Sequence, residues 1–163
     1  RLNFVVVTGA SDGIGKAFAK QLANLGLNIV LISRSKDKLD LVAEEIENQF
    51  AVETKVIAVD FTNGASVYDQ IKESIEGLDV GVLINNVGMS IDKPNRFLEC
   101  ELHCEGSEKF LKDILFCNVF PVTLMTRLVL PGMISRKRGV VVNVGSLLGV
   151  VPTPFAAAYS ATK

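Results

Sequence analysis

The sequence predicts an α/β domain in which parallel strands alternate with helices to form a doubly wound sheet. Three observations point to this fold. Short apolar, β-branched runs recur along the 163 residues, and amphipathic segments of helical length separate them. The order βαβαβαβαβ continues without a repeat, a low-complexity tract or a domain linker. Hydrophobic residues make up 48% of the chain, as expected when parallel strands are buried on both faces.

Five strands are expected where apolar, β-branched residues cluster. They are residues 3–8, 28–32, 54–59, 80–84 and 140–144. Helical spacing of apolar residues predicts helices between them, at 14–25, 36–50 and 65–76. After an irregular stretch at 88–106, a long helix is expected from 107 to about 135. Pro121 and Pro131 should bend or interrupt this helix, because proline lacks the backbone N–H.

Composition excludes several function classes. Lys plus Arg is 17 and Asp plus Glu is 18, so the net charge of −1 argues against a nucleic-acid partner. The odd count of three cysteines fits a reducing compartment rather than a disulfide framework. Cys100, His103 and Cys104 lie close together, but a second ligand pair is absent, so no metal site is expected.

The first strand runs into the glycine-rich sequence TGASDGIG at residues 8–15, and a helix follows. Glycines allow a tight turn, and the N–H groups at a helix N-terminus bind phosphate. A P-loop is excluded because Ala10 and Ala17 occupy two of its required positions. The candidate cofactor-binding residues of this turn are Thr8, Gly9, Ser11, Asp12, Gly13, Ile14 and Gly15.

The end of the second strand bears on which dinucleotide is bound. An acidic residue there would bind the ribose 2′-hydroxyl of NAD, but this chain has Ser33 followed by Arg34. A guanidinium can bind a phosphate with two parallel hydrogen bonds, and Lys36 and Lys38 lie in the next turn. The sequence therefore predicts NADPH as the cofactor. The alternative, that Arg34 only begins a solvated helix, stays open.

Further motifs make the chain resemble the short-chain dehydrogenase/reductase family. The sequence NNVG at 85–88 follows the fourth strand, Ser146 follows the fifth, and YSATK occupies 159–163. Ser146 and Tyr159 are 13 residues apart, the usual spacing in that family. The resemblance covers essentially all 163 residues and implies a Rossmann fold.

The resemblance implies four catalytic residues, Asn118, Ser146, Tyr159 and Lys163. Tyr159 and Lys163 share one helix face, where an ammonium stabilises the phenolate of a tyrosine acid. Lys163 would also bind the nicotinamide ribose, and Asn118 would hold a water in a relay to Lys163. The further cofactor-binding residues that the resemblance implies are Asp60, against the adenine, with Asn86, Tyr159 and Lys163.

A narrower resemblance is carried by NNVGMS at 85–90, VLPGM at 129–133 and GLDVGVLINN at 77–86. These segments are similar to the very-long-chain 3-oxoacyl-CoA reductases, a branch that includes 17-beta-hydroxysteroid dehydrogenase types 3 and 12. The branch implies NADPH-dependent reduction of the 3-oxo group of a long-chain acyl-CoA in fatty-acid elongation. It also implies a location at the endoplasmic reticulum membrane.

Two other functions stay open. Reduction of a steroid ketone would use the same four catalytic residues. A non-catalytic dinucleotide-binding or interaction module is the second alternative, although the intact catalytic set argues against it. A serine hydrolase is not expected, because Ser146 lacks the G-x-S-x-G context and His103 is the only histidine.

Both ends look cut, since Arg1 is not a methionine and Lys163 falls inside a starting helix. We therefore expect residues 1–163 to form one NAD(P)-binding Rossmann domain, truncated after the fifth strand. The expected partner is a small-molecule substrate, an acyl-CoA or a steroid ketone. Membrane association would come from segments outside these residues, and a homodimer stays open.

Overall fold

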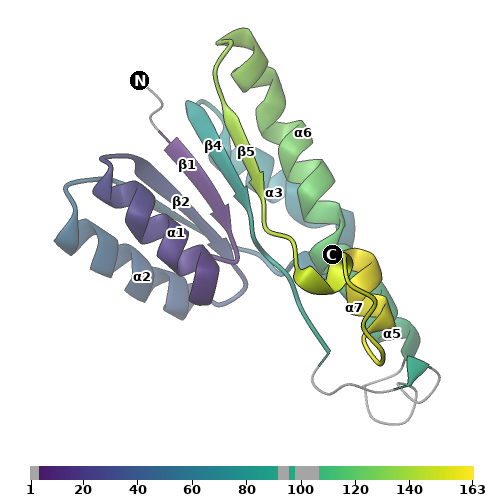
Figure 1. The fold of residues 1–163 in the computed structure, drawn as a ribbon. Helices are drawn as coiled ribbons and strands as arrows, with labels where there is room; N and C mark the ends of the chain where they lie inside the picture. Colours follow the sequence, from purple (N-terminus) through teal and green to yellow (C-terminus); the bar gives the residue numbers. More distant parts are fainter. Residues whose placement is uncertain (1–3, 92–95, 98–106) are drawn as a thin grey trace.

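A computed structural model describes residues 4–91, 96–97 and 107–163. It confirms the doubly wound parallel sheet, with five strands in the order β3-β2-β1-β4-β5 (Figure 1). The strands are β1 (Phe4–Thr8), β2 (Asn28–Ser33), β3 (Thr54–Ala58), β4 (Val80–Asn85) and β5 (Val140–Asn143). The strand order reverses between β1 and β4, which leaves a crevice at their carboxyl ends where such folds bind ligands.

Helices cover both faces of the sheet (Figure 1). One face is covered by α1 (Gly13–Asn24) and α2 (Lys36–Gln49), and the other by α3 (Val67–Ile75) and α6 (Phe120–Ser135). The remaining elements are the 3-10 turns η1 (Phe61–Ser66) and η3 (Leu147–Gly149) and the helices α5 (Ser107–Asn118) and α7 (Ala157–Thr162).

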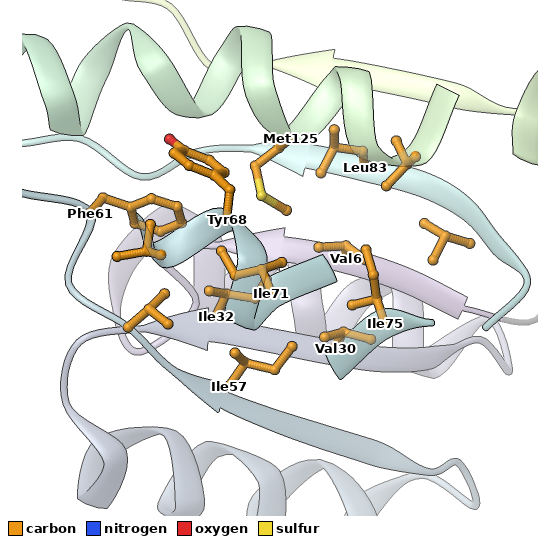
Figure 2. Packing of buried hydrophobic residues seen from close by; sticks show 14 of the residues in the cluster. Val6, Val30, Ile32, Ile57, Phe61, Tyr68, Ile71, Ile75, Leu83 and Met125 are labelled. Carbon is orange, nitrogen blue, oxygen red and sulfur yellow. The ribbon is translucent and has the colours of Figure 1, made fainter. Parts of the chain in front are cut away.

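Alternate residues of the central strands enter two separate cores. Val5 and Val7 pack toward α1 and α2, whereas Val6 packs toward α3 and α6. Figure 2 shows the second core, where Ile71 and Met125 lie over the sheet. Because both faces are buried, the central strands are apolar along their whole length, which is why the sequence identifies them so well.

The third predicted helix starts differently from the prediction. Residues 61–66 form a 3-10 turn, and the α-helix begins only at Val67. The Asp60 carboxylate accepts the Thr62 N–H at 3.0 Å, and Gly64 has a φ of 79°. The Asp60 cap starts the 3-10 turn, and the left-handed Gly64 interrupts it, so the regular α-helix forms only after these residues.

The long predicted helix is divided at Val119 into α5 and α6. Pro121 stands in the first turn of α6, where its missing N–H costs nothing. Pro131 lies inside α6 without ending it. Residues 92–95 and 98–106, with Cys100, His103 and Cys104, lie outside the described residues.

The helical segment Glu108–Ser135 is long and apolar enough to cross a membrane by length and composition alone. Its residues Met125, Val129 and Met133 are buried in the core beside the sheet.

Candidate active site

A cavity of about 860 Å³ opens at the carboxyl edge of the sheet, where the strand order reverses. It brings together predicted cofactor-binding residues from four separate parts of the chain. Those that line it are Gly9, Ser11, Asp12, Gly13, Ser33, Arg34, Asp60 and Asn86. The candidates from the glycine turn, from the end of β2, from the end of β3 and from the end of β4 therefore share one space.

Thr8 lies behind this cavity and ties the ends of β1 and β4 together. Its hydroxyl donates to the Ile84 carbonyl at 3.2 Å and accepts the N–H groups of Asn86 and Val87, each at 3.0 Å. The Thr8 side chain is fully buried. The sequence predicted a cofactor contact for Thr8; the structure shows the hydrogen bonds of its side chain, and the cofactor contact stays a prediction.

Asn86 explains why the turn needs two of its glycines. Its Nδ2 donates to the carbonyls of Thr8 at 2.9 Å and Gly9 at 3.2 Å. A β-carbon on Gly9 would lie 2.8 Å from this nitrogen, and one on Gly15 would lie 2.5 Å from it. Real β-carbons do not approach so closely, so Gly15 lets α1 pack against the turn. The remaining candidate, Ile14, is 59% exposed on α1.

The glycine turn ends at a capped helix. The Asp12 carboxylate accepts the Gly13 N–H at 2.7 Å, and Gly13 has a φ of 54° with open space beside it. A hydrogen bond of 3.0 Å between the Ser11 and Ser33 hydroxyls joins this turn to the end of β2. Arg34, which follows Ser33, therefore lies at the same side of the cavity as the turn.

Cys117 is a cavity residue that sequence reasoning did not single out as a site residue. Its side chain is 8% exposed, and burial raises the pKa of the thiol to about 11, with Asp60 adding to the shift. The thiol therefore stays protonated near neutral pH. Its position immediately before Asn118 on α5 was the one signal that could have identified it.

A second pocket of about 250 Å³ adjoins the first, and Val87 lines both. Asn118 and Lys163, two of the predicted catalytic residues, line this second pocket. The Lys163 ammonium donates to the Val144 carbonyl at 2.8 Å. Its backbone N–H donates to the Tyr159 carbonyl at 3.1 Å, so Tyr159 and Lys163 are one helical turn apart, as the sequence predicted.

The side-chain amide of Asn118 makes all of its hydrogen bonds in the structure to other residues of the protein. Its Oδ1 accepts the Met89 N–H at 2.7 Å, and its Nδ2 donates to the Met89 carbonyl and to the Thr162 hydroxyl, each at 2.9 Å. Both amide hydrogens are thus used, and the residue is 3% exposed. The Asn118 side chain holds the strand-end loop that carries Met89 against the helix that carries Tyr159.

Ser146 caps η3 by accepting the Leu148 N–H at 3.2 Å. Among the described residues, no hydrogen bond joins Ser146 to Tyr159. Gly149, at the end of η3, packs against the backbone of Lys163. This contact holds the Ser146 turn beside the Tyr159 helix, and sequence reasoning missed it because the two residues meet only in the folded chain.

The sequence profile of the short chain dehydrogenase family matches residues 3–163. The chain belongs to this family. Within it, the resemblance to the very-long-chain 3-oxoacyl-CoA reductases is confirmed. The chain is 51% identical to the enzyme of that name from Bos taurus and 49% identical to that from Anas platyrhynchos, over 98% of its residues. It spans about half the length of these curated relatives, 50% in both cases.

Solved short-chain dehydrogenases share the fold. A bulky-bulky ketone specific alcohol dehydrogenase from Comamonas testosteroni superposes with a TM-score of 0.86 at 28% identity, covering 99% of this chain and 62% of that one. A short-chain dehydrogenase from Sphingobium yanoikuyae in complex with NADPH superposes with a TM-score of 0.86 at 29% identity. The match covers 99% of this chain and 61% of that one.

Proposed function

We propose that the protein is an NADPH-dependent reductase of ketones, and that its substrate is the 3-oxo group of a long-chain acyl-CoA. One observation carries the proposal. The 860 Å³ cavity gathers the glycine turn and Arg34, and it adjoins the pocket lined by Asn118 and Lys163. A cavity that suits a dinucleotide thus adjoins the pocket of the proposed catalytic helix, at the edge of the sheet where such folds bind ligands.

The residues of the cavity fit a nicotinamide dinucleotide. Gly9 and Gly13 line the cavity in front of α1, whose N-terminal N–H groups suit a pyrophosphate. Arg34 would bind the 2′-phosphate, Asp60 the adenine, and Asn86 would hold the wall in between. Ser33, being uncharged, does not repel the 2′-phosphate.

When bound, NADPH supplies the hydride that reduces the carbonyl carbon. Tyr159 donates a proton to the carbonyl oxygen as the charge on that oxygen develops. Ser146 already accepts the Leu148 N–H, so its own O–H is left to donate to the same oxygen. The Lys163 ammonium would favour the tyrosinate that remains and would bind the ribose of the cofactor.

The substrate class rests on the relatives rather than on a pocket of this chain. Curated proteins that are 46–51% identical are named very-long-chain 3-oxoacyl-CoA reductases or their A and B forms. The same resemblance supports a location at the endoplasmic reticulum membrane through segments outside residues 1–163. We further propose that these residues form a single NAD(P)-binding domain of a longer protein.

The test compares ketones on the complete protein. With NADPH, kcat/KM should be higher for a long-chain 3-oxoacyl-CoA than for a short-chain one and than for a 17-ketosteroid. A clear preference for the steroid would replace the acyl-CoA with a steroid ketone as the substrate. Binding of NADPH without reduction of any ketone would support the non-catalytic alternative.

A further inference from the structure

The hydroxyl of Thr162 lies between two of the proposed catalytic residues. It accepts a hydrogen bond from Nδ2 of Asn118 at 2.9 Å and donates to the carbonyl of Tyr159 at 2.8 Å. Thr162 itself lines the pocket that holds Lys163. A single side chain thus connects α5 to α7, which lie beside each other (Figure 1).

The connection continues beyond Asn118 to the wall of the cofactor cavity. Asn118 holds both the N–H and the carbonyl of Met89, and Met89 lines the 860 Å³ cavity. A continuous set of hydrogen bonds therefore runs from Met89 through Asn118 and Thr162 to the backbone of Tyr159. It spans residues that are 29 and 44 positions apart in the chain.

This role requires a hydroxyl that accepts and donates at once. An aliphatic side chain would leave an Asn118 amide hydrogen without a partner, and Asn118 is 3% exposed. An unpaired buried donor is unfavourable, so the amide would turn to find another acceptor and would release Met89. A serine at position 162 would keep both hydrogen bonds.

We propose that Thr162 is a positioning residue, which fixes the Tyr159–Lys163 turn relative to the Met89 wall of the cofactor cavity. This inference rests on the proposed function. Small displacements of a catalytic group lower the rate strongly, so the loss of the link should reduce turnover more than cofactor binding.

Ser66 provides a matched control. Its hydroxyl donates to the Asn63 carbonyl at 3.4 Å, three residues back, just as Thr162 donates to Tyr159. Ser66 is exposed and lines neither the cofactor cavity nor the pocket that holds Lys163. Removing its hydroxyl therefore reports the effect of losing a local helix bond alone.

The experiment uses the complete protein with Thr162→Val, Thr162→Ser and Ser66→Ala. We measure kcat, the Kd for NADPH by fluorescence titration, and hydrogen–deuterium exchange of the peptide that contains Met89. Thr162→Val should lower kcat by about tenfold or more, leave Kd within roughly twofold, and speed exchange at Met89 by about tenfold. Thr162→Ser should keep all three values near those of the wild type, and Ser66→Ala should change none of them.

The inference is overturned if Thr162→Val behaves like Ser66→Ala, or if Thr162→Ser is as impaired as Thr162→Val. Should the valine variant fail to fold, Thr162→Ala removes the hydroxyl without adding bulk and is held to the same outcomes. The exchange measurement needs no turnover. An inactive wild-type protein would therefore refute the proposed function, while exchange at Met89 would still decide the role of Thr162.

Discussion

Gly149 packs against the backbone of Lys163 so closely that a β-carbon at position 149 would lie 2.6 Å from the Lys163 carbonyl oxygen. The obstructing atoms belong to the backbone, so they cannot move aside as the end of a flexible side chain would. The contact joins the turn that follows Ser146 to the helix that carries Tyr159.

Replacing Gly149 with alanine should therefore destabilise the protein by about 1–3 kcal/mol, the usual cost of overpacking. Thermal or denaturant unfolding of the complete protein measures this. Gly145→Ala is the matched control in the same loop, because a β-carbon there meets no atom within 4 Å. Equal stability of the two variants would show that the Gly149 contact is not tight in solution.

Arg34→Ala should raise the KM for NADPH and leave that for NADH almost unchanged. The reason is that Arg34 lines the cavity beside Ser33, where the 2′-phosphate distinguishes the two cofactors. Steady-state kinetics with each cofactor measure the effect. Lys38→Ala is the control, since Lys38 is exposed and does not line this cavity. An equal effect on both cofactors, or a wild-type preference for NADH, would contradict the role given to Arg34.

The ion pairs of Glu45 on α2 with Lys16 and Lys20 on α1 should make the stability of the protein depend on pH. Hydrogen bonds from Lys16 and Lys20 lower the pKa of its carboxyl to about 2. A carboxyl with a lowered folded-state pKa stabilises the fold above its unfolded value and loses that contribution as pH falls. The melting temperature of Glu45→Gln should therefore be lower than that of the wild type at pH 7. This difference in melting temperature should disappear as the pH falls from about 4.5 to 2. A difference in melting temperature that does not change with pH would refute the prediction.

Cys117 should be protected from alkylation. Burial raises the pKa of its thiol to about 11, and the side chain faces the cofactor cavity. Reaction with iodoacetamide should be slow at pH 7, should rise by about tenfold per pH unit below the pKa, and should slow further with NADPH. Peptide mapping by mass spectrometry separates Cys117 from the other two cysteines. Fast labelling at pH 7 in the presence of NADPH would contradict this placement.

The sequence predicted the strands to within about a residue. Three of them, β1, β2 and β4, are buried on both faces and are therefore almost uniformly apolar. The edge strands β3 and β5 are more exposed and are marked by their β-branched residues. The prediction was less accurate where single residues decide the geometry. The 3-10 turn at 61–66 depends on the Asp60 cap and on the left-handed Gly64, neither of which alters the apolar periodicity. The division of the long helix at Val119 leaves no mark in the hydrophobic pattern, but the prediction that Pro121 would interrupt the helix is confirmed, whereas Pro131 does not end it.

The cofactor-binding candidates belong to motifs that are local in sequence, and most of them line one cavity in the structure. The supporting contacts could not be predicted. Thr162 meets Asn118 across 44 residues, and Gly149 meets Lys163 only once η3 and α7 have packed. Such contacts depend on tertiary structure, and a sequence pattern shows only that a small or hydroxyl-bearing residue stands there.

The central claim is that Tyr159 donates the proton in an NADPH-dependent ketone reduction. Its most direct test is the turnover rate of Tyr159→Phe in the complete protein at saturating NADPH, with the Kd for NADPH measured on the same variant. The rate should fall by about 10²–10⁴, the usual contribution of a general acid, while Kd stays nearly unchanged because the phenol oxygen alone is removed. Retention of more than roughly a tenth of the wild-type rate would contradict the claim.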